Sequence, residues 1–238
     1  MDRAEAISRL TALVGCDLRQ LANDFGITVW KDDKKNKGWA GHVIERCLGL
    51  PINSSRAPNF GSWELKVFPV ADRRGALHVK ETIAITMIDP VEVLAKPFAK
   101  SHLFNKLHKM LVVGRIWESV AEDRSILYSV GEFDLSNPAV YRQCEEDYNL
   151  VRSTIAEHGF SALSGKMGLL IQPRTKGAGH GSTSRAFYAR AKFVNQIAQL
   201  QQPDKGLWAR DNDGAWSYLL TDGRSWICGF GQETLPPD

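Results

Sequence analysis

Residues 63–70 (WELKVFPV) alternate polar and apolar side chains, and this alternation constrains the fold more than any other feature of the sequence. A period of two predicts a β-strand. A turn at residues 72–75 leads into a second alternating run at residues 77–88, which ends at Asp89 and Pro90. The two runs together predict a β-hairpin, which provides the first two strands of a sheet.

The rest of the chain predicts helices interspersed with further strands. Apolar spacing indicates two short helices within residues 3–24, broken near Gly15, and further helices at residues 38–48, 102–110 and 138–158. Strands are predicted at residues 111–120 and 167–172, and a short strand followed by a helix at residues 186–200. The expected fold class is therefore α/β, with a mixed central sheet flanked by helices.

Composition places the chain among soluble globular proteins. It has 238 residues, of which 43% are hydrophobic and 24% charged, so disordered and collagen-like classes are excluded. No apolar run reaches the length of about 18 residues that a spanning helix needs, so no membrane association is expected. The four cysteines are far apart and form no CxxC pair, which favours free thiols and a cytoplasmic location.

Charge is sorted along the chain although its net value is only +3. Residues 158–203 contain six Lys or Arg and no acid, and residues 96–115 contain five Lys or Arg and no acid. Residues 118–147, between them, carry eight acids. This sorting indicates one positive surface for a polyanion, and nucleic acid is the expected partner. The alternative is a biased set of solvated faces.

Glu64 and Lys66 lie one residue apart in the predicted strand and so point to the same face. A carboxylate there can bind a hard divalent cation such as Mg²⁺, and the amine can orient the water that attacks phosphorus. A further oxygen ligand is expected from the loop at Asn59 or from Glu45 on the preceding helix. The alternative for so short a motif is an ordinary ion pair on an exposed face.

The segment around this strand resembles a known nuclease family. The pattern KGWxGxxxExxLG at residues 37–49, PxF at 58–60 and ELKxxP at 64–69 is similar to the MutH/Sau3AI branch of the PD-(D/E)xK endonucleases. That branch includes a mismatch-repair nicking endonuclease and related type II restriction enzymes. The resemblance continues in order through residues 101–113, 138–158, 168–177 and 185–194, and covers about residues 5–201.

The resemblance implies a restriction-endonuclease-like domain at residues 1–202. Residues 203–238 have no counterpart in it. This tail carries three of the seven tryptophans (Trp208, Trp216 and Trp226) between turn-forming residues, which predicts a small β-rich extension packed on the domain.

The resemblance also assigns roles near the predicted strand. It implies Mg²⁺ as cofactor, Lys66 as the catalytic lysine, and a metal site formed by Glu64, the Leu65 carbonyl and the residue at position 59. Glu45 and Lys37 are implied near the same site. The aspartate of the family falls on Asn59, a departure that should lower metal affinity and could nearly abolish cleavage. Two accounts remain open: replacement of an aspartate to trap an uncut complex, and a naturally impaired nuclease.

The same resemblance implies that residues of the two basic stretches contact DNA. Gln172, Arg174 and Lys176 are expected to read base edges, since Arg and Gln suit bidentate contacts to guanine and adenine. Tyr188 falls at the position that senses adenine methylation, with Arg185 beside it. The expected phosphate contacts are Lys106, His108 and Lys109, whereas Arg190 and Lys192 are interpreted as solvated cations.

The function expected from the sequence is a Mg²⁺-dependent type II restriction endonuclease that acts on double-stranded DNA. The tail and the reading segment at residues 172–177 favour this over a repair nickase. One alternative is a MutH-like nicking endonuclease, and another is a catalytically dead DNA-binding module. One chain offers one active site, so cleavage of both strands needs a homodimer or a monomer that nicks the strands in turn.

Overall fold

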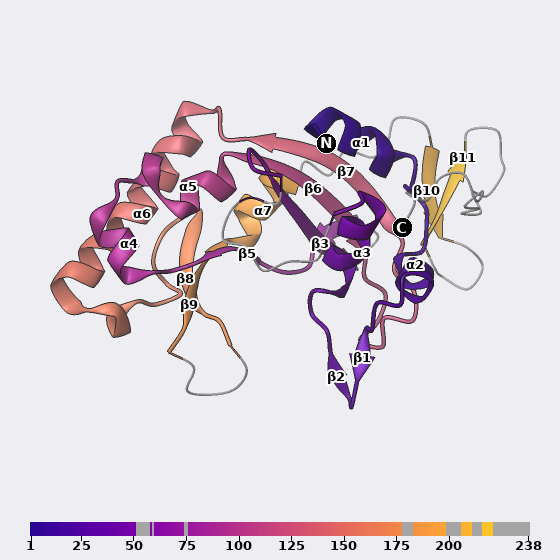
Figure 1. Ribbon diagram of the computed structural model, residues 1–238, viewed down its shortest axis with the longest axis horizontal. Helices are drawn as coiled ribbons and strands as arrows, with labels where there is room; N and C mark the ends of the chain where they lie inside the picture. Colours follow the sequence, from indigo (N-terminus) through magenta and orange to yellow (C-terminus); the bar gives the residue numbers. More distant parts are fainter. Residues whose placement is uncertain are drawn as a thin grey trace.

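Two β-sheets form the body of the protein (Figure 1). The computed structural model describes residues 1–50, 58, 60–73, 76–177 and 183–198, and the strands at 206–210 and 216–220. The larger sheet has the strand order β4-β3-β6-β7, with bounds Ala76–Val79, Glu64–Arg73, Lys109–Ile116 and Leu127–Asp134. The smaller sheet has the order β5-β9-β8, with bounds Ile83–Met87, Arg185–Ala189 and Ile171–Thr175.

The larger sheet is mixed, as the sequence predicts. Strands β3 and β6 pair in parallel, with Glu64 opposite Met110 at one end and Val70 opposite Ile116 at the other. The remaining pairs, β3 with β4 and β6 with β7, are antiparallel. The predicted α/β class with a mixed sheet flanked by helices is therefore confirmed, and the fold is restriction-endonuclease-like.

Helices cover the sheets and link their strands. In chain order they are α1 (Arg3–Thr11), α2 (Leu18–Asp24), α3 (Trp39–Cys47), α4 (Pro90–Ala95), α5 (His102–Leu107), α6 (Pro138–His158) and α7 (Ala191–Ala198). Two 3₁₀ turns, η1 (Phe98–Lys100) and η2 (Phe160–Ala162), and a short hairpin of β1 (Trp30–Lys31) and β2 (Lys34–Lys35) complete this part. Helices α4 and α6 lie with the smaller sheet at one end of the molecule (Figure 1).

Local sequence explains the longest helix. The side chain of Asn137 accepts hydrogen bonds from the backbone N–H groups of Ala139 and Val140, and Pro138 occupies the first turn. Gly159 ends the helix at φ +81°, a conformation that glycine adopts without a side-chain penalty. The bounds 138–158 predicted from the sequence are confirmed.

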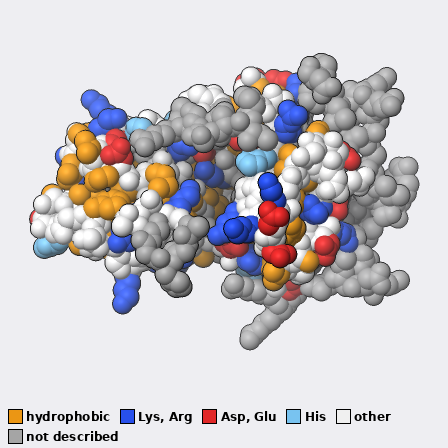
Figure 2. Space-filling view, turned by 60° about the horizontal axis from the view of Figure 1, so that its bottom comes forward, with side chains coloured by type: hydrophobic (Ala, Val, Ile, Leu, Met, Phe, Trp, Pro, Cys, Tyr) orange, Lys and Arg blue, Asp and Glu red, His pale blue; other side chains and the backbone are white. Residues whose placement is uncertain are grey.

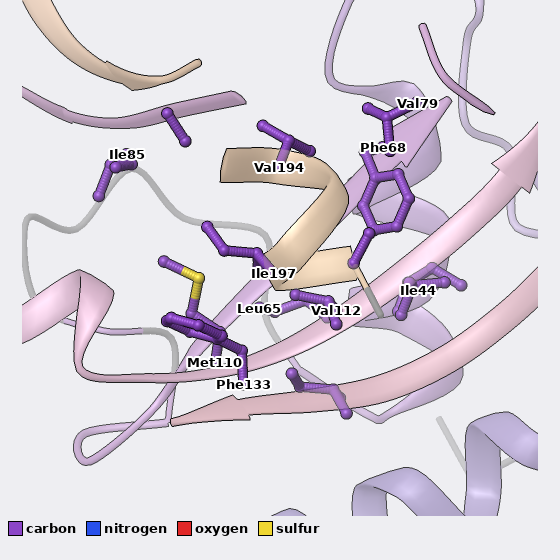
Figure 3. Packing of buried hydrophobic residues seen from close by; sticks show 14 of the residues in the cluster. Ile44, Leu65, Phe68, Val79, Ile85, Met110, Val112, Phe133, Val194 and Ile197 are labelled. Carbon is purple, nitrogen blue, oxygen red and sulfur yellow. The ribbon is translucent and has the colours of Figure 1, made fainter. Parts of the chain in front are cut away.

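One part of the hydrophobic core lies between helix α7 and the larger sheet. Figure 3 shows Val194 and Ile197 of this helix above Met110, Val112 and Phe133 of the sheet. Seven of the eight residues of β6 are buried, because this strand has a neighbour on both edges and packing on both faces. The site described below lies at the end of the sheet where β6 and its parallel neighbour begin.

The structure corrects three predictions about elements. The run at residues 77–88 is two strands: β4 pairs with β3, while β5 pairs with β9 in the other sheet. Strand β8 begins at Ile171 rather than at residue 167, since Asp147 holds the preceding loop. Strand β7 and helix α4 were not predicted.

The cysteines follow the sequence expectation in part. Cys47 and Cys144 are free thiols, and burial raises the pKa of each to about 12. Cys16 is disulfide-bonded, so the expectation of a free thiol is wrong there. The wide spacing of the cysteines gave no sign of this bond.

In the tail, β10 (Gly206–Arg210) and β11 (Trp216–Leu220) form an antiparallel pair, as short strands in this region predict. That the extension packs on the domain stays a prediction. Among the described residues, no helix is both long and apolar enough to cross a membrane.

Candidate active site

Glu64 and Lys66 share one face of β3, as their spacing predicts. Glu64 is the first residue of the strand and is only 2% exposed. The Nζ atom of Lys66 donates a hydrogen bond to Oε1 of Glu64 at 2.6 Å. Leu65 points to the opposite face and is buried in the core. The strand thus anchors an acid and an amine side by side, an arrangement that can serve metal-assisted hydrolysis at phosphorus.

A second lysine reaches the same carboxylate. Nζ of Lys106, on the last turn of α5, lies 3.2 Å from Oε1 of Glu64, and its side chain is 12% exposed. Helix α5 leads directly into β6, and β6 pairs with β3 so that Met110 lies opposite Glu64. The sequence grouped Lys106 with His108 and Lys109, but the parallel pairing brings Lys106 to the acid.

This cluster opens into a cleft of about 600 Å³. Lys66 and Lys106 line one part of the cleft, and residues 84–90 with Glu92 and His102 line another. Lys176, from the segment after β8, completes the basic wall. Figure 2 shows Lys and Arg side chains gathered around a recess on this face of the molecule. Asp89 and Glu92 also line the cleft, so its lysine-lined part is the one that suits an anionic substrate.

The donor set at Glu64 fits a hard divalent cation in part. A carboxylate is the ligand that Mg²⁺ prefers, and Glu64 presents one beside the cleft. Among the described residues, no three His, Cys, Asp or Glu side chains gather closely enough to hold a metal ion. Asn59, expected as a second ligand, lies outside the described residues.

Helix α3 carries the other two residues implied near the site. Glu45 is 9% exposed, on the side of the helix that faces the protein, and α3 contacts β3. Lys37 is exposed and lies just before the helix. The structure therefore brings Glu45 to the neighbourhood of β3 and leaves Lys37 at the surface.

A buried acid that the sequence did not single out holds α3 in place. Glu122, 1% exposed, accepts a hydrogen bond from Trp39 Nε1 at 2.8 Å and pairs with Arg115 at 3.1 Å and with Lys35. Burial alone would raise the pKa of Glu122, but the hydrogen bond from Lys35 and the charge of Arg115 outweigh it and lower this pKa. The positive φ of Glu122, +51°, was not visible in the sequence.

Strands β8 and β9 present the predicted base-reading residues on one face. Gln172 lies opposite Tyr188, and Arg174 follows Gln172 on the same face. The guanidinium of Arg174 stands 5.4 Å from the centre of the Tyr188 ring and donates to Thr82 Oγ1 at 2.8 Å. Burial raises the pKa of Tyr188, which keeps its hydroxyl protonated. The structure therefore brings these three residues together.

The loop before β8 is held from both sides. The buried carboxylate of Asp147 accepts hydrogen bonds from the backbone N–H groups of residues 169–171, at 2.7–2.8 Å. The guanidinium of Arg190 donates to the carbonyls of residues 165, 167 and 168. Arg190 is thus a loop-bracing residue rather than the solvated cation expected from sequence.

Three predicted DNA contacts lie away from this face. Arg185 pairs with Thr175 across the sheet and donates to the carbonyl of Ser161 in η2. His108 stacks on Phe104, and the charges of His108 and Lys109 contribute to lowering the pKa of Asp134. Their roles as DNA contacts stay predictions.

A sequence model of the family described as DNA mismatch repair enzyme MutH matches residues 48–152, which include β3, α5 and β6. The DNA mismatch repair protein MutH of Vibrio vulnificus strain YJ016 is 26% identical over 219 residues, covering 82% of this chain and 92% of the relative. The MutH protein of Shewanella woodyi is 29% identical, covering 81% and 89%, and that of Haemophilus ducreyi is 28% identical, covering 84% and 96%.

The mixed sheet, the acid and lysine on one strand, and the basic cleft define a nuclease of the restriction-endonuclease-like class. The matched segment contains Glu64, Lys66 and Lys106, so the similarity covers the centre of the site. Over most of its length the chain is similar to the MutH endonucleases.

Proposed function

We propose that this protein is a Mg²⁺-dependent endonuclease that nicks one strand of double-stranded DNA, as a mismatch-repair enzyme. The observation that carries the proposal is the Glu64, Lys66 and Lys106 cluster facing a basic cleft. The relatives named MutH match over most of their length, which favours strand nicking over the type II restriction activity expected from the sequence. That expectation depended on the tail and on residues 172–177, which are weaker evidence.

Each residue of the cluster has a chemical role in phosphodiester hydrolysis. Glu64, the Leu65 carbonyl and the side chain at position 59 would hold the metal ion. When bound, Mg²⁺ would supply Lewis-acid stabilisation of the charge that develops on the phosphate. Lys66 orients the attacking water, and Lys106, which contacts the same carboxylate oxygen of Glu64, stabilises the same negative charge. Water forms the new bond to phosphorus as the ester bond to the leaving oxygen breaks.

The face of β8 and β9 would supply sequence recognition. Arg174 and Gln172 have the donor and acceptor groups that read guanine and adenine edges. Tyr188 lies against Arg174, so a change at either residue alters the surface offered to the DNA. Recognition and cleavage would both belong to residues 1–202, with residues 203–238 as an added segment.

A plasmid assay tests the proposal. Supercoiled plasmid is incubated with Mg²⁺ and the protein, and in parallel with its Asn59→Asp variant. Nicked circles, produced faster by the Asn59→Asp variant, are the expected result, because a carboxylate binds Mg²⁺ more strongly than an amide. Glu64→Gln in the same background is the matched control, and it should abolish nicking without unfolding the protein.

Other outcomes would overturn parts of this proposal. Discrete linear fragments from the Asn59→Asp variant would favour the restriction enzyme. No cleavage by either form, together with tight DNA binding, would mean a DNA-binding module that has lost its catalytic function.

A further inference from the structure

Lys176 lies on the DNA-reading face but at its catalytic end. Residues 172, 174 and 176 point the same way, because side chains along a strand alternate between faces. The backbone N–H of Lys176 donates to the carbonyl of Ser184 at 2.9 Å, which extends the pairing of β8 and β9 by one residue. The orientation of Lys176 is therefore set by the sheet rather than by a loose loop.

The side chain of Lys176 enters the same cleft as the catalytic cluster. Lys66, Lys106 and Lys176 all line the cleft of about 600 Å³, although they come from β3, α5 and the end of β8. Burial, and then the positive charges of Lys66 and Lys106, lower the pKa of Lys176. Three ammonium groups meet at this part of the cleft, and the carboxylate of Glu64 offsets only one of the three charges, so this part can hold an anion; Asp89 and Glu92 line the cleft as well.

We propose that Lys176 binds a backbone phosphate at the cleavage centre instead of a base edge, so that the strand that reads the DNA also holds the phosphate that is cut. This inference rests on the proposed function, since a DNA phosphate is the anion assigned to the cleft. It changes the role expected for Lys176 from sequence, because its neighbours in the cleft are catalytic residues.

The placement has a consequence for specificity. Arg174 and Lys176 are two residues apart on one strand, about 7 Å along it. A base pair that Arg174 cannot contact would shift the strand and move Lys176 away from the phosphate. Discrimination between sequences would then be expressed in the cleavage rate as well as in the binding affinity.

A neutral substitution tests this role. Lys176→Met keeps the length of the side chain and removes its charge, and the matched control is Lys192→Met on the exposed surface of α7. All variants are made in the Asn59→Asp background, and the target site is mapped first from nicked plasmid or, for a non-cutting protein, selected from random duplexes. We expect Lys176→Met to slow single-turnover cleavage at saturating DNA by roughly 10- to 100-fold. The control should cleave at the parental rate.

Binding gives a second readout that does not depend on cleavage. Lys176→Met should weaken binding of target and random duplexes by the same factor and lower the salt dependence by about one phosphate contact. Lys176→Arg should restore most of the affinity, because it restores the charge.

A modified duplex separates a phosphate contact from a base contact. Single phosphates around the cleaved bond are replaced one at a time by neutral methylphosphonates. At one position, the replacement should weaken DNA binding by the parent several-fold but should not change the affinity of the Lys176→Met variant. This is the result that a double-mutant cycle gives when the two groups are in contact. In binding assays, Lys176→Met should also discriminate between bases as well as the parent does, whereas its discrimination in cleavage rate should fall.

The results distinguish this inference from the proposed function. If the parent nicks DNA but Lys176→Met binds and cleaves at the parental level, the inference is wrong and the proposed function stands. If Lys176→Met loses discrimination in binding, and no methylphosphonate position removes the effect of the substitution, Lys176 contacts a base and the inference is wrong. If the parent does not cleave DNA under any condition, the proposed function is wrong. The binding measurements on Lys176→Met then still test the phosphate contact.

Discussion

Removal of the Glu122 carboxylate should destabilise the protein strongly. Its oxygens accept from Trp39 at 2.8 Å and pair with Arg115 at 3.1 Å and with Lys35, and the side chain is 1% exposed. Glu122→Ala would leave the buried guanidinium of Arg115 without this carboxylate. Because Trp39 is the first residue of α3, the loss acts on the helix that carries Glu45.

The expected cost can be set from this geometry. Breaking a buried pair by removing one partner costs about 3–5 kcal/mol, because the remaining charge stays in a poorly solvated place. Such a loss is a large part of the 5–15 kcal/mol typical of a folded domain. In a domain of this size it should lower the Tm by roughly 6–20 °C. Glu122→Gln keeps the shape and one acceptor for Trp39 but also leaves the charge of Arg115 without a carboxylate, so it should destabilise the protein nearly as much.

Urea unfolding of the parent and both variants measures the difference directly. Since the pKa of Glu122 is lowered in the folded state, its stabilisation is complete well above pH 4.5, the ordinary value. This stabilisation should be lost as the pH falls through the lowered pKa of Glu122 in the folded protein. The difference in free energy of unfolding between the parent and Glu122→Ala should therefore shrink in acid. A cost below about 1 kcal/mol at pH 7, or a gap that widens in acid, would refute the reasoning.

Three further variants test other parts of the structure. Lys106→Met should slow single-turnover nicking by about 10²–10³-fold, since it removes a charge beside Glu64, while Lys100→Met on the exposed surface should not; equal rates for the two would contradict the role of Lys106. Arg3→Met should cost about 0.5–1 kcal/mol in urea unfolding, because the ion pair with Asp134 is partly exposed. The hydrogen bond from Arg3 lowers the pKa of Asp134 below its ordinary value of 3.8, so this cost should be present at pH 7 and be lost as the pH falls through the lowered value; a pH-independent cost would point to lost packing instead. Arg174→Ala should reduce discrimination against a single wrong base pair by about 1–3 kcal/mol in binding assays, and equal losses on target and random DNA would exclude a reading role.

The sequence predicted the local features that depend on near neighbours in the chain. Alternation at residues 63–70 predicted β3 and the shared face of Glu64 and Lys66, and apolar spacing with Pro138 and Gly159 predicted α6. These features follow from side-chain period and backbone preference, which are properties of a short segment. The family resemblance likewise depended on short motifs around β3.

Contacts between distant segments could not be read in this way. The break between β4 and β5 depends on which sheet each strand joins, and nothing in the alternating run marks that choice. The role of Arg190 was misjudged because its acceptors are backbone carbonyls, which leave no sign in a sequence. Glu122 was only one acid in an acidic stretch until its three partners were placed around it.

The sequence by itself thus determined the α/β class, the strand that presents Glu64 and Lys66, and the basic character of the segments around it. Only the tertiary structure decided that Lys106 contacts Glu64 and that Lys176 shares their cleft. The physical reason is that the first set follows from the period of a single chain segment. The second set requires β3 and β6 to pair in parallel and the smaller sheet to lie beside them, which the whole core determines.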